Sequence, residues 1–216
     1  MSLATKVKYL GKTIFKDVLY RRLTPGLGCK PDRIYLWTDV LMKTQDMKGH
    51  VLEVGCSIGY NASYSNYLLK RLQKPRPYLC VDTFSGFVDE QFQTDVDEGT
   101  KKSQGTMFSA SSIDLTRWYL DKHGAKNIEL LKADIVTIDE NKLPEKISAC
   151  LLDVDLLEPI YEGLKKIYPR VEMGGIVLVD DCEGEMWQGR KGYEKFMEEI
   201  GKEPEYSYGM GILRKV

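Results

Sequence analysis

Short apolar runs alternate along most of this chain with longer segments in which apolar residues recur every three or four positions. A short, mostly apolar run bounded by turn residues is typical of a strand buried inside a parallel sheet. Five runs meet this description and are predicted to be strands: residues 51–54, 78–82, 127–131, 147–152 and 176–179.

The segments between these runs have helical spacing. Helices are predicted at residues 32–43, 60–72, 158–171 and 192–200, and from residue 111 onward. The tail, residues 205–216, alternates loosely around Tyr208-Gly209 and predicts an antiparallel hairpin. We therefore expect an α/β fold: a doubly wound, mostly parallel seven-stranded sheet with helices on both faces and a C-terminal antiparallel hairpin.

Three stretches carry finer predictions. Ser111 and Asp114 stand at capping-box spacing, which predicts the start of a helix. That helix is expected to bury an apolar face made of Leu115, Trp118 and Tyr119. Gly174-Gly175 is expected to end the helix at residues 158–171. Residues 88–106 are polar and acidic without an apolar period, which predicts a mobile loop over a ligand-binding site.

The N-terminal segment has an apolar pattern of its own, which Thr24-Pro25-Gly26 ends. Its apolar positions include Val7, Leu10, Ile14 and Val18, and lysines and arginines lie elsewhere on the helix. Such a basic amphipathic helix favours packing on the domain or on a second subunit. A substrate lid and a membrane-surface helix are the alternatives. We divide the chain into an N-terminal helical segment, residues 1–47, and a main domain, residues 48–216.

Composition narrows the class of protein. The 216 residues are enough for one domain with a full central sheet, and a net charge of -1 disfavours binding to bulk nucleic acid. Five cysteines without a C-x-x-C pair indicate small buried side chains in a reducing cytoplasm. No apolar run is long enough to cross a bilayer and no signal peptide is visible. We expect a cytoplasmic protein that binds neither nucleic acid nor membrane.

Residues 51–60 combine a strand end with the spacing Glu53-x-Gly55-x-x-x-Gly59. Glycine permits the tight backbone turn and the close approach of a ligand to the main chain. A dinucleotide turn needs a third glycine that is missing here, and an acid suits a cationic ligand better than a diphosphate. The stretch resembles motif I of the class I S-adenosylmethionine-dependent methyltransferases. Any other strand–turn–helix of an α/β fold is the alternative.

Acidic residues follow several predicted strands. Because parallel strands present their carboxyl ends at one edge, the acids expected there together are Glu53, Asp82, Asp153, Asp155, Asp180 and Asp181. Like charges so close together indicate that a cation shares the edge. The two oxygens of Asp82 suit the ribose hydroxyls of a nucleoside, and a turn cap is the alternative role.

Five stretches, including Asp-Thr-Phe-Ser-Gly-Phe and Asp-Val-Asp-Leu, resemble the macrocin O-methyltransferase family. They are residues 52–55, 81–87, 151–156, 174–181 and 189–192. The resemblance implies a Rossmann-like methyltransferase fold, S-adenosylmethionine and a divalent metal such as Mg²⁺. It implies as acceptor a small-molecule hydroxyl, such as one on a sugar of a glycosylated natural product. It also implies that Asp153, Asp180 and Asp181 bind the metal and that Asp153 is the catalytic base.

On this interpretation, residues 48–216 form the methyltransferase domain. The predicted cofactor-binding residues are Glu53, Gly55, Cys56, Gly59, Asp82, Thr83, Phe84, Asp134, Ile135 and Asp153. A metal-independent methyltransferase for another small acceptor and a non-catalytic S-adenosylmethionine-binding protein are the alternative functions. The acceptor, the pathway and the formation of a homodimer stay open at this stage.

Overall fold

Seven strands form one sheet in the part of the chain that the computed structural model describes, residues 29–184 and 186–216. Their order across the sheet is β3-β2-β1-β4-β5-β7-β6. They are β1 His50–Val54, β2 Tyr78–Asp82, β3 Glu129–Lys132, β4 Ile147–Leu152, β5 Val171–Val179, β6 Glu205–Ser207 and β7 Met210–Arg214. β1 to β5 are parallel, while β7 runs antiparallel to β5 and β6. The predicted sheet and its closing hairpin are confirmed.

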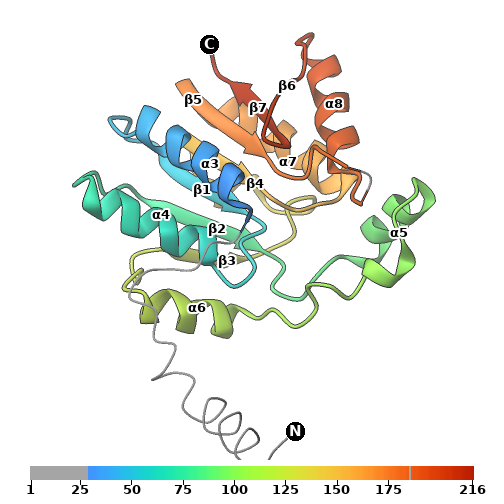
Figure 1. Cartoon of the computed structure of the whole chain (residues 1–216), viewed down its shortest axis with the longest axis horizontal. Coiled ribbons are helices and arrows are strands. Elements are labelled where there is room, and N and C mark those ends of the chain that lie inside the picture. Colours follow the sequence, from blue (N-terminus) through green and yellow to red (C-terminus); the bar gives the residue numbers. More distant parts are fainter. Residues whose placement is uncertain (1–28, 185) are drawn as a thin grey trace, which may run out of the picture.

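Helices cover both faces of this sheet (Figure 1). The helices on the two faces are α3 Pro31–Lys43, α4 Tyr60–Arg71, α6 Ile113–Lys122, α7 Leu157–Ile167 and α8 Gly189–Glu199, while α5 Asp89–Asp97 lies to one side of the sheet. One apolar cluster joins Leu52 of β1 to Ile160 of α7 and Phe196 of α8, and the other joins Val51 to Trp37 of α3. Successive strand residues point to opposite faces, so the neighbours Val51 and Leu52 fall into different clusters. The doubly wound arrangement is confirmed.

α3 is packed into the second of these clusters. Trp37 is fully buried, and its Nε1 donates a hydrogen bond to Ser65 Oγ of α4 at 2.8 Å. The amphipathic helix predicted before α3 lies outside the described residues. Neither α3 nor any other helix of the described part is long and apolar enough to cross a membrane.

The loop predicted at residues 88–106 is wrong, because the stretch holds α5 and a short 3-10 turn. The residues that α5 buries are polar, namely Gln91 and Asp95. Asp95 accepts hydrogen bonds from the backbone N–H groups of Leu157 and Gln188. A helix whose buried face is polar has no apolar period, so hydrophobic spacing could not reveal it.

α6 begins one residue later than predicted, because its cap is Ser112 instead of Ser111. The buried residues of α6 are Thr116 and Leu120. The predicted buried face is therefore wrong: Tyr119 is half-buried, and the exposed members are Leu115 at 37% and Trp118 at 52%. α6 carries apolar residues on more than one side, and only its contact with the turn after β1 selects the side that is buried.

The helix predicted at residues 158–171 ends early, since α7 stops at Ile167 and β5 already begins at Val171. Gly174-Gly175 lies inside β5 and does not end the helix. Val171 pairs with Ile147 and Ile176 pairs with Ala149, so residues 172–175 of β5 lie opposite the single residue 148 of β4. The two glycines therefore mark a bulge in a strand. Paired glycines occur both in bulges and at helix ends, so the pair by itself did not distinguish the two.

Candidate functional site

A cavity of about 430 Å³ lies at the carboxyl ends of the parallel strands. The loops that follow β1, β2, β3, β4 and β5 line it, and so does Arg33 of α3. The acids that line it are Asp82, Asp134, Asp153, Asp155, Asp180 and Asp181. This is the edge at which doubly wound sheets bind ligands, and the volume is in the range of small-molecule sites.

The turn after β1 depends on two glycines with a positive φ. Gly55 has a φ of 88°, and Gly59, the N-cap of α4, has a φ of 87°. A Cβ atom on Gly55 would lie 1.7 Å from the carbonyl oxygen of Asp153. Glycine therefore lets the turn after β1 touch the end of β4, and the two loops form one continuous wall.

Asp82 joins the turns after β1 and β2. Its Oδ2 accepts a hydrogen bond from the backbone N–H of Ser57 at 2.7 Å, and its Oδ1 accepts one from that of Phe84 at 2.7 Å. The capping role that the sequence left open is therefore present. Asp82 also lines the cavity, and a carboxylate offers about four acceptor positions, so the caps leave capacity for a ligand.

Glu53 is placed differently from the other predicted residues of the edge. It is 1% exposed, is not part of the cavity wall, and accepts a hydrogen bond from the Tyr78 hydroxyl at 2.7 Å. Burial raises the pKa of Glu53 to about 8. The raised pKa favours the protonated form of Glu53 near neutral pH, which weakens the negative charge expected of this residue from the sequence.

The other predicted cofactor residues fall into two groups. Those that line the cavity are Gly55, Cys56, Asp82, Thr83, Asp134, Ile135 and Asp153. Gly59 and Phe84 are set back from it, as Glu53 is. The loops after β1, β2, β3 and β4 thus bring most of the predicted set to one surface.

We expect Glu53→Gln to stabilise the ligand-free protein at pH 8. The folded pKa of about 8 lies above the ordinary value of 4.5, so the folded state binds more protons between these values and loses stability as the pH rises through this window. Glutamine still accepts a hydrogen bond from Tyr78 and has no charge to bury. Denaturant unfolding at pH 5 and pH 8 should show a loss of stability that is larger in the wild type than in the variant by an amount on the order of a few kcal/mol, because the buried acids of the cavity contribute to the loss in both proteins. Equal losses in both proteins would contradict this.

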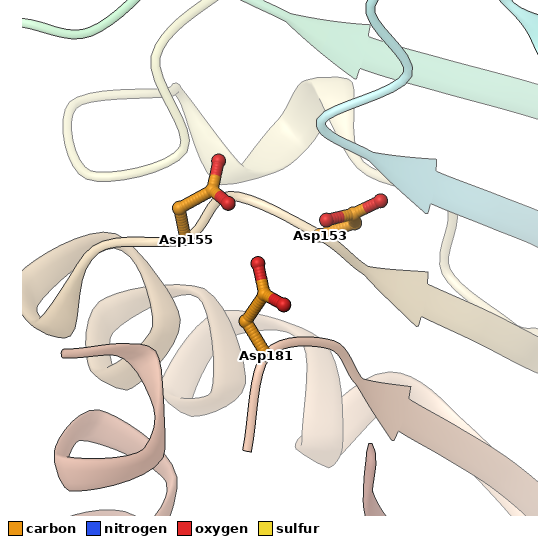
Figure 2. A group of neighbouring side chains, drawn as sticks. All are labelled: Asp153, Asp155 and Asp181. Atoms are coloured by element: carbon orange, nitrogen blue, oxygen red, sulfur yellow. The ribbon is translucent and has the colours of Figure 1, made fainter. Parts of the chain in front are cut away.

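Three carboxylates, Asp153, Asp155 and Asp181, lie together at the end of the cavity formed by β4 and β5 (Figure 2). One oxygen from each lies within 4.8 Å of the others. We call this group the acidic triad. Asp155 and Asp181 have φ values of 62° and 53°, a left-handed conformation that non-glycine residues adopt at a cost, often at functional sites.

Arg33 of α3 links Asp180 to Asp181, a member of this triad. Its Nη1 lies 2.5 Å from Asp180 Oδ1 and 2.8 Å from Asp181 Oδ1. The set predicted from the sequence contained Asp153, Asp180 and Asp181, so the triad differs from it by one member. Nothing in the sequence indicated Arg33, because its pairing with residues about 150 positions away depends on how α3 packs.

The triad holds its charges at an electrostatic cost. Burial, followed by the charge of Asp180, raises the pKa of Asp153 well above its ordinary value. Burial and a hydrogen bond to Asp181 do the same to the pKa of Asp155. Burial also raises the pKa of Asp180 to about 6, although Arg33 opposes this. Because carboxylate oxygens are the ligands of hard cations, the donor set fits a divalent ion such as Mg²⁺.

Three aromatic side chains from different loops form another part of the cavity lining: Phe87, Phe108 and Trp187. The ring centroid of Phe87 lies 5.4 Å from that of Phe108 and 5.3 Å from that of Trp187. We call them the aromatic wall. Nothing in the sequence pattern indicated Phe108 or Trp187, since single aromatic residues in loops carry no periodic signal.

Comparisons with known proteins agree with this architecture. Residues 38–202 match the family model described as Macrocin-O-methyltransferase (TylF). The O-methyltransferase NovP has a similar structure, with a TM-score of 0.70 and 17% identity over 86% of this chain and 80% of that one. CalS11, a calicheamicin methyltransferase, has a TM-score of 0.70 and 19% identity over 84% and 78% of the two chains.

A putative rRNA-methylase from Clostridium thermocellum is also similar, with a TM-score of 0.59 and 12% identity over 88% of this chain and 98% of that one. The search of curated proteins gives no match. At these identities the solved structures show only that the fold is shared. The family relationship rests on the match to the family model.

Proposed function

The chain belongs to the macrocin O-methyltransferase family, and on this basis we propose that it methylates a sugar hydroxyl of a small natural product. As a member of this family it is an S-adenosylmethionine-dependent methyltransferase. The observation that carries the proposal is the shared cavity. The turn after β1, the acidic triad and the aromatic wall all line one space of about 430 Å³.

The cofactor is proposed to lie along the loops after β1, β2 and β3. Residues 55–57 would contact its methionine part, Asp82 its ribose, and Asp134 with Ile135 its adenine. The carboxylate of Asp134 is already oriented, because it accepts a hydrogen bond from Gln91 Nε2 at 2.8 Å. The predicted residues set back from the cavity would support this wall from behind: Glu53, Gly59 and Phe84.

Asp153 is proposed as the base of the methyl transfer. The acceptor oxygen attacks the methyl carbon, the new C–O bond forms as the C–S bond breaks, and the hydroxyl proton passes to a carboxylate oxygen of Asp153. A magnesium ion held by the acidic triad would supply a positive charge that stabilises the deprotonated hydroxyl.

The acceptor is proposed to bind where the acidic triad and the aromatic wall share the cavity. A sugar ring carries hydroxyl groups at its edge and C–H groups on its faces. Carboxylates accept hydrogen bonds from the hydroxyls, and aromatic rings pack against the C–H faces. Phe87, Phe108 and Trp187 offer such a surface.

A metal-independent methyltransferase is the second candidate, and the position of Arg33 favours it. The guanidinium already neutralises part of the acidic edge through Asp180 and Asp181. In that case Asp153 would act as an unassisted base, and the acceptor would need a more acidic hydroxyl than a sugar has.

Isothermal titration and a methyl-transfer screen together test the function. S-adenosylmethionine should bind the purified protein with and without Mg²⁺, and transfer to at least one glycoside in the screen should require Mg²⁺. Transfer that persists in excess EDTA would favour the second candidate. Cofactor binding without transfer to any glycoside or small hydroxyl compound would contradict both.

Asp82→Ala is expected to weaken the binding of S-adenosylmethionine by about 1–3 kcal/mol, because both the ribose and two backbone N–H groups lose a charged acceptor. The affinity of Asp82→Asn, which keeps one acceptor oxygen, should lie between that of Asp82→Ala and that of the wild type. Titration with S-adenosylmethionine measures the effect. An affinity within a few-fold of the wild type in both variants would mean that Asp82 only caps the turns.

A further inference from the structure

Asp95 lies between the starts of two helices. It is fully buried on α5; its Oδ1 accepts from the backbone N–H of Leu157 at 3.0 Å and its Oδ2 from that of Gln188 at 3.2 Å. Leu157 is the first residue of α7, and Gln188 is the N-cap of α8. Neither helix has a side-chain cap of its own, so the carboxylate satisfies N–H groups at both positively polarised helix starts.

Residues that line the cavity stand just before both of these helix starts. Asp155 of the acidic triad stands two residues before Leu157, and Trp187 of the aromatic wall directly precedes Gln188. The two segments are in contact, because a Cβ atom on Gly189 would lie 2.8 Å from the carbonyl oxygen of Asp155. The carboxylate of Asp95 therefore joins a segment that holds an acid to a segment that holds an aromatic ring.

A second connection holds the same segment on the other side of Trp187. Thr100 Oγ1 donates a hydrogen bond to the carbonyl oxygen of Met186 at 3.2 Å and accepts one from Gln188 Nε2 at 3.3 Å. Thr100 is 4% exposed. Residues 95–100 thus hold the backbone both before and after Trp187.

We propose that Asp95 is a positioning residue for methyl transfer, which sets the distance between Asp155 and Trp187 without touching the substrate. The inference rests on the function proposed above, because it takes the acidic triad and the aromatic wall as the two sides of the acceptor site. Loss of the carboxylate lets the two helix starts separate, and the acceptor then sits less well relative to the acids. A misplacement of about 1 Å is enough to lower catalysis about a hundredfold.

The test compares Asp95→Asn with Asp97→Asn, a matched change on the exposed side of the same helix. Both are made in a Trp118→Phe background, since Trp118 is exposed and Trp37 is fully buried, so that acrylamide quenching of fluorescence reports mainly on Trp187. Titration with S-adenosylmethionine gives the cofactor affinity. Steady-state kinetics use the glycoside that the wild type methylates in the screen.

Asp95→Asn should increase quenching of Trp187, raise the acceptor KM and lower kcat, with a combined loss in kcat/KM of about tenfold to a hundredfold. Cofactor affinity should stay within about threefold, because the carboxylate of Asp95 binds the starts of α7 and α8 and not the loops after β1, β2 and β3. Asp97→Asn should match the wild type in every measurement. Thr100→Val should change the quenching of Trp187, the acceptor KM and kcat in the same direction but by less. If Asp95→Asn does not fold, Thr100→Val is used for the test in its place.

Unchanged quenching and unchanged acceptor KM in a folded Asp95→Asn protein would overturn the proposal. A parallel loss of cofactor affinity would also overturn it, since it would indicate a general structural role. Failure of the proposed function has a different signature: the wild type methylates no glycoside, while the quenching of Trp187 still decides whether Asp95 holds the segment.

Discussion

Gly55→Ala is expected to abolish detectable binding of S-adenosylmethionine. The added Cβ would lie 1.7 Å from the carbonyl oxygen of Asp153, so either the turn after β1 or the end of β4 has to move. Both loops line the cavity, and their displacement removes the surface on which the cofactor lies. The positive φ of Gly55 adds a conformational cost of about 1–3 kcal/mol. Titration with S-adenosylmethionine and thermal unfolding measure the two effects.

Gly124→Ala is the matched control for this change. Gly124 also has a positive φ, 71°, but a Cβ atom there would have no heavy atom of the described residues within 4 Å. This variant should lose stability from the backbone strain alone and bind the cofactor as the wild type does. If Gly55→Ala is folded and binds the cofactor within tenfold of the wild type, the turn is not the cofactor site.

The acidic triad carries the second large effect. Asp153→Asn, Asp155→Asn and Asp181→Asn keep the side-chain size and remove a charge, and each should lower turnover about a hundredfold or more. Asp153→Asn should be the most severe because it removes the proposed base as well. Cofactor affinity should change little. Titration with Mg²⁺ should show weaker binding in all three, and EDTA should reproduce the loss of turnover in the wild type, with added Mg²⁺ reversing it.

Stability gives this prediction an independent readout. Burial and like charges raise the pKa values of Asp153 and Asp155, which means that their ionised forms destabilise the metal-free protein. Asp153→Asn and Asp155→Asn should therefore each unfold at a higher temperature than the wild type when Mg²⁺ is absent. This combination of a more stable protein and a less active one is expected where charges are held together for function.

Asp180→Asn and Asp139→Asn separate the triad from acids in general. Asp180 is paired with Arg33, so its replacement should weaken Mg²⁺ binding less than that of Asp155. Asp139 is exposed and is not part of the cavity lining, so its variant should keep the Mg²⁺ affinity and the activity of the wild type. Full activity of the wild type in excess EDTA, or equal Mg²⁺ affinity in all variants, would contradict the metal mechanism.

Hydrophobic spacing was sufficient to predict the sheet. The five parallel strands and the hairpin around Tyr208-Gly209 depend on local patterns of apolar residues and turn residues, which act over a few neighbouring positions. The turn at Gly55 and the acids at the strand ends followed from the same patterns, because parallel strands deliver their carboxyl ends to one edge. These features could be read without knowing how the helices pack.

The tertiary structure alone decided which of these side chains work together. Arg33 reaches Asp180 and Asp181 only because α3 packs against the sheet, and the folded loops after β4 and β5 bring Asp155 together with Asp153 and Asp181. The polar buried face of α5 and the link from Asp95 to two distant helix starts have no periodic signal, since each hydrogen bond joins residues more than 60 positions apart. Apolar burial repeats along a chain and is visible in its sequence, whereas a buried polar group depends on the particular partner that folding brings to it.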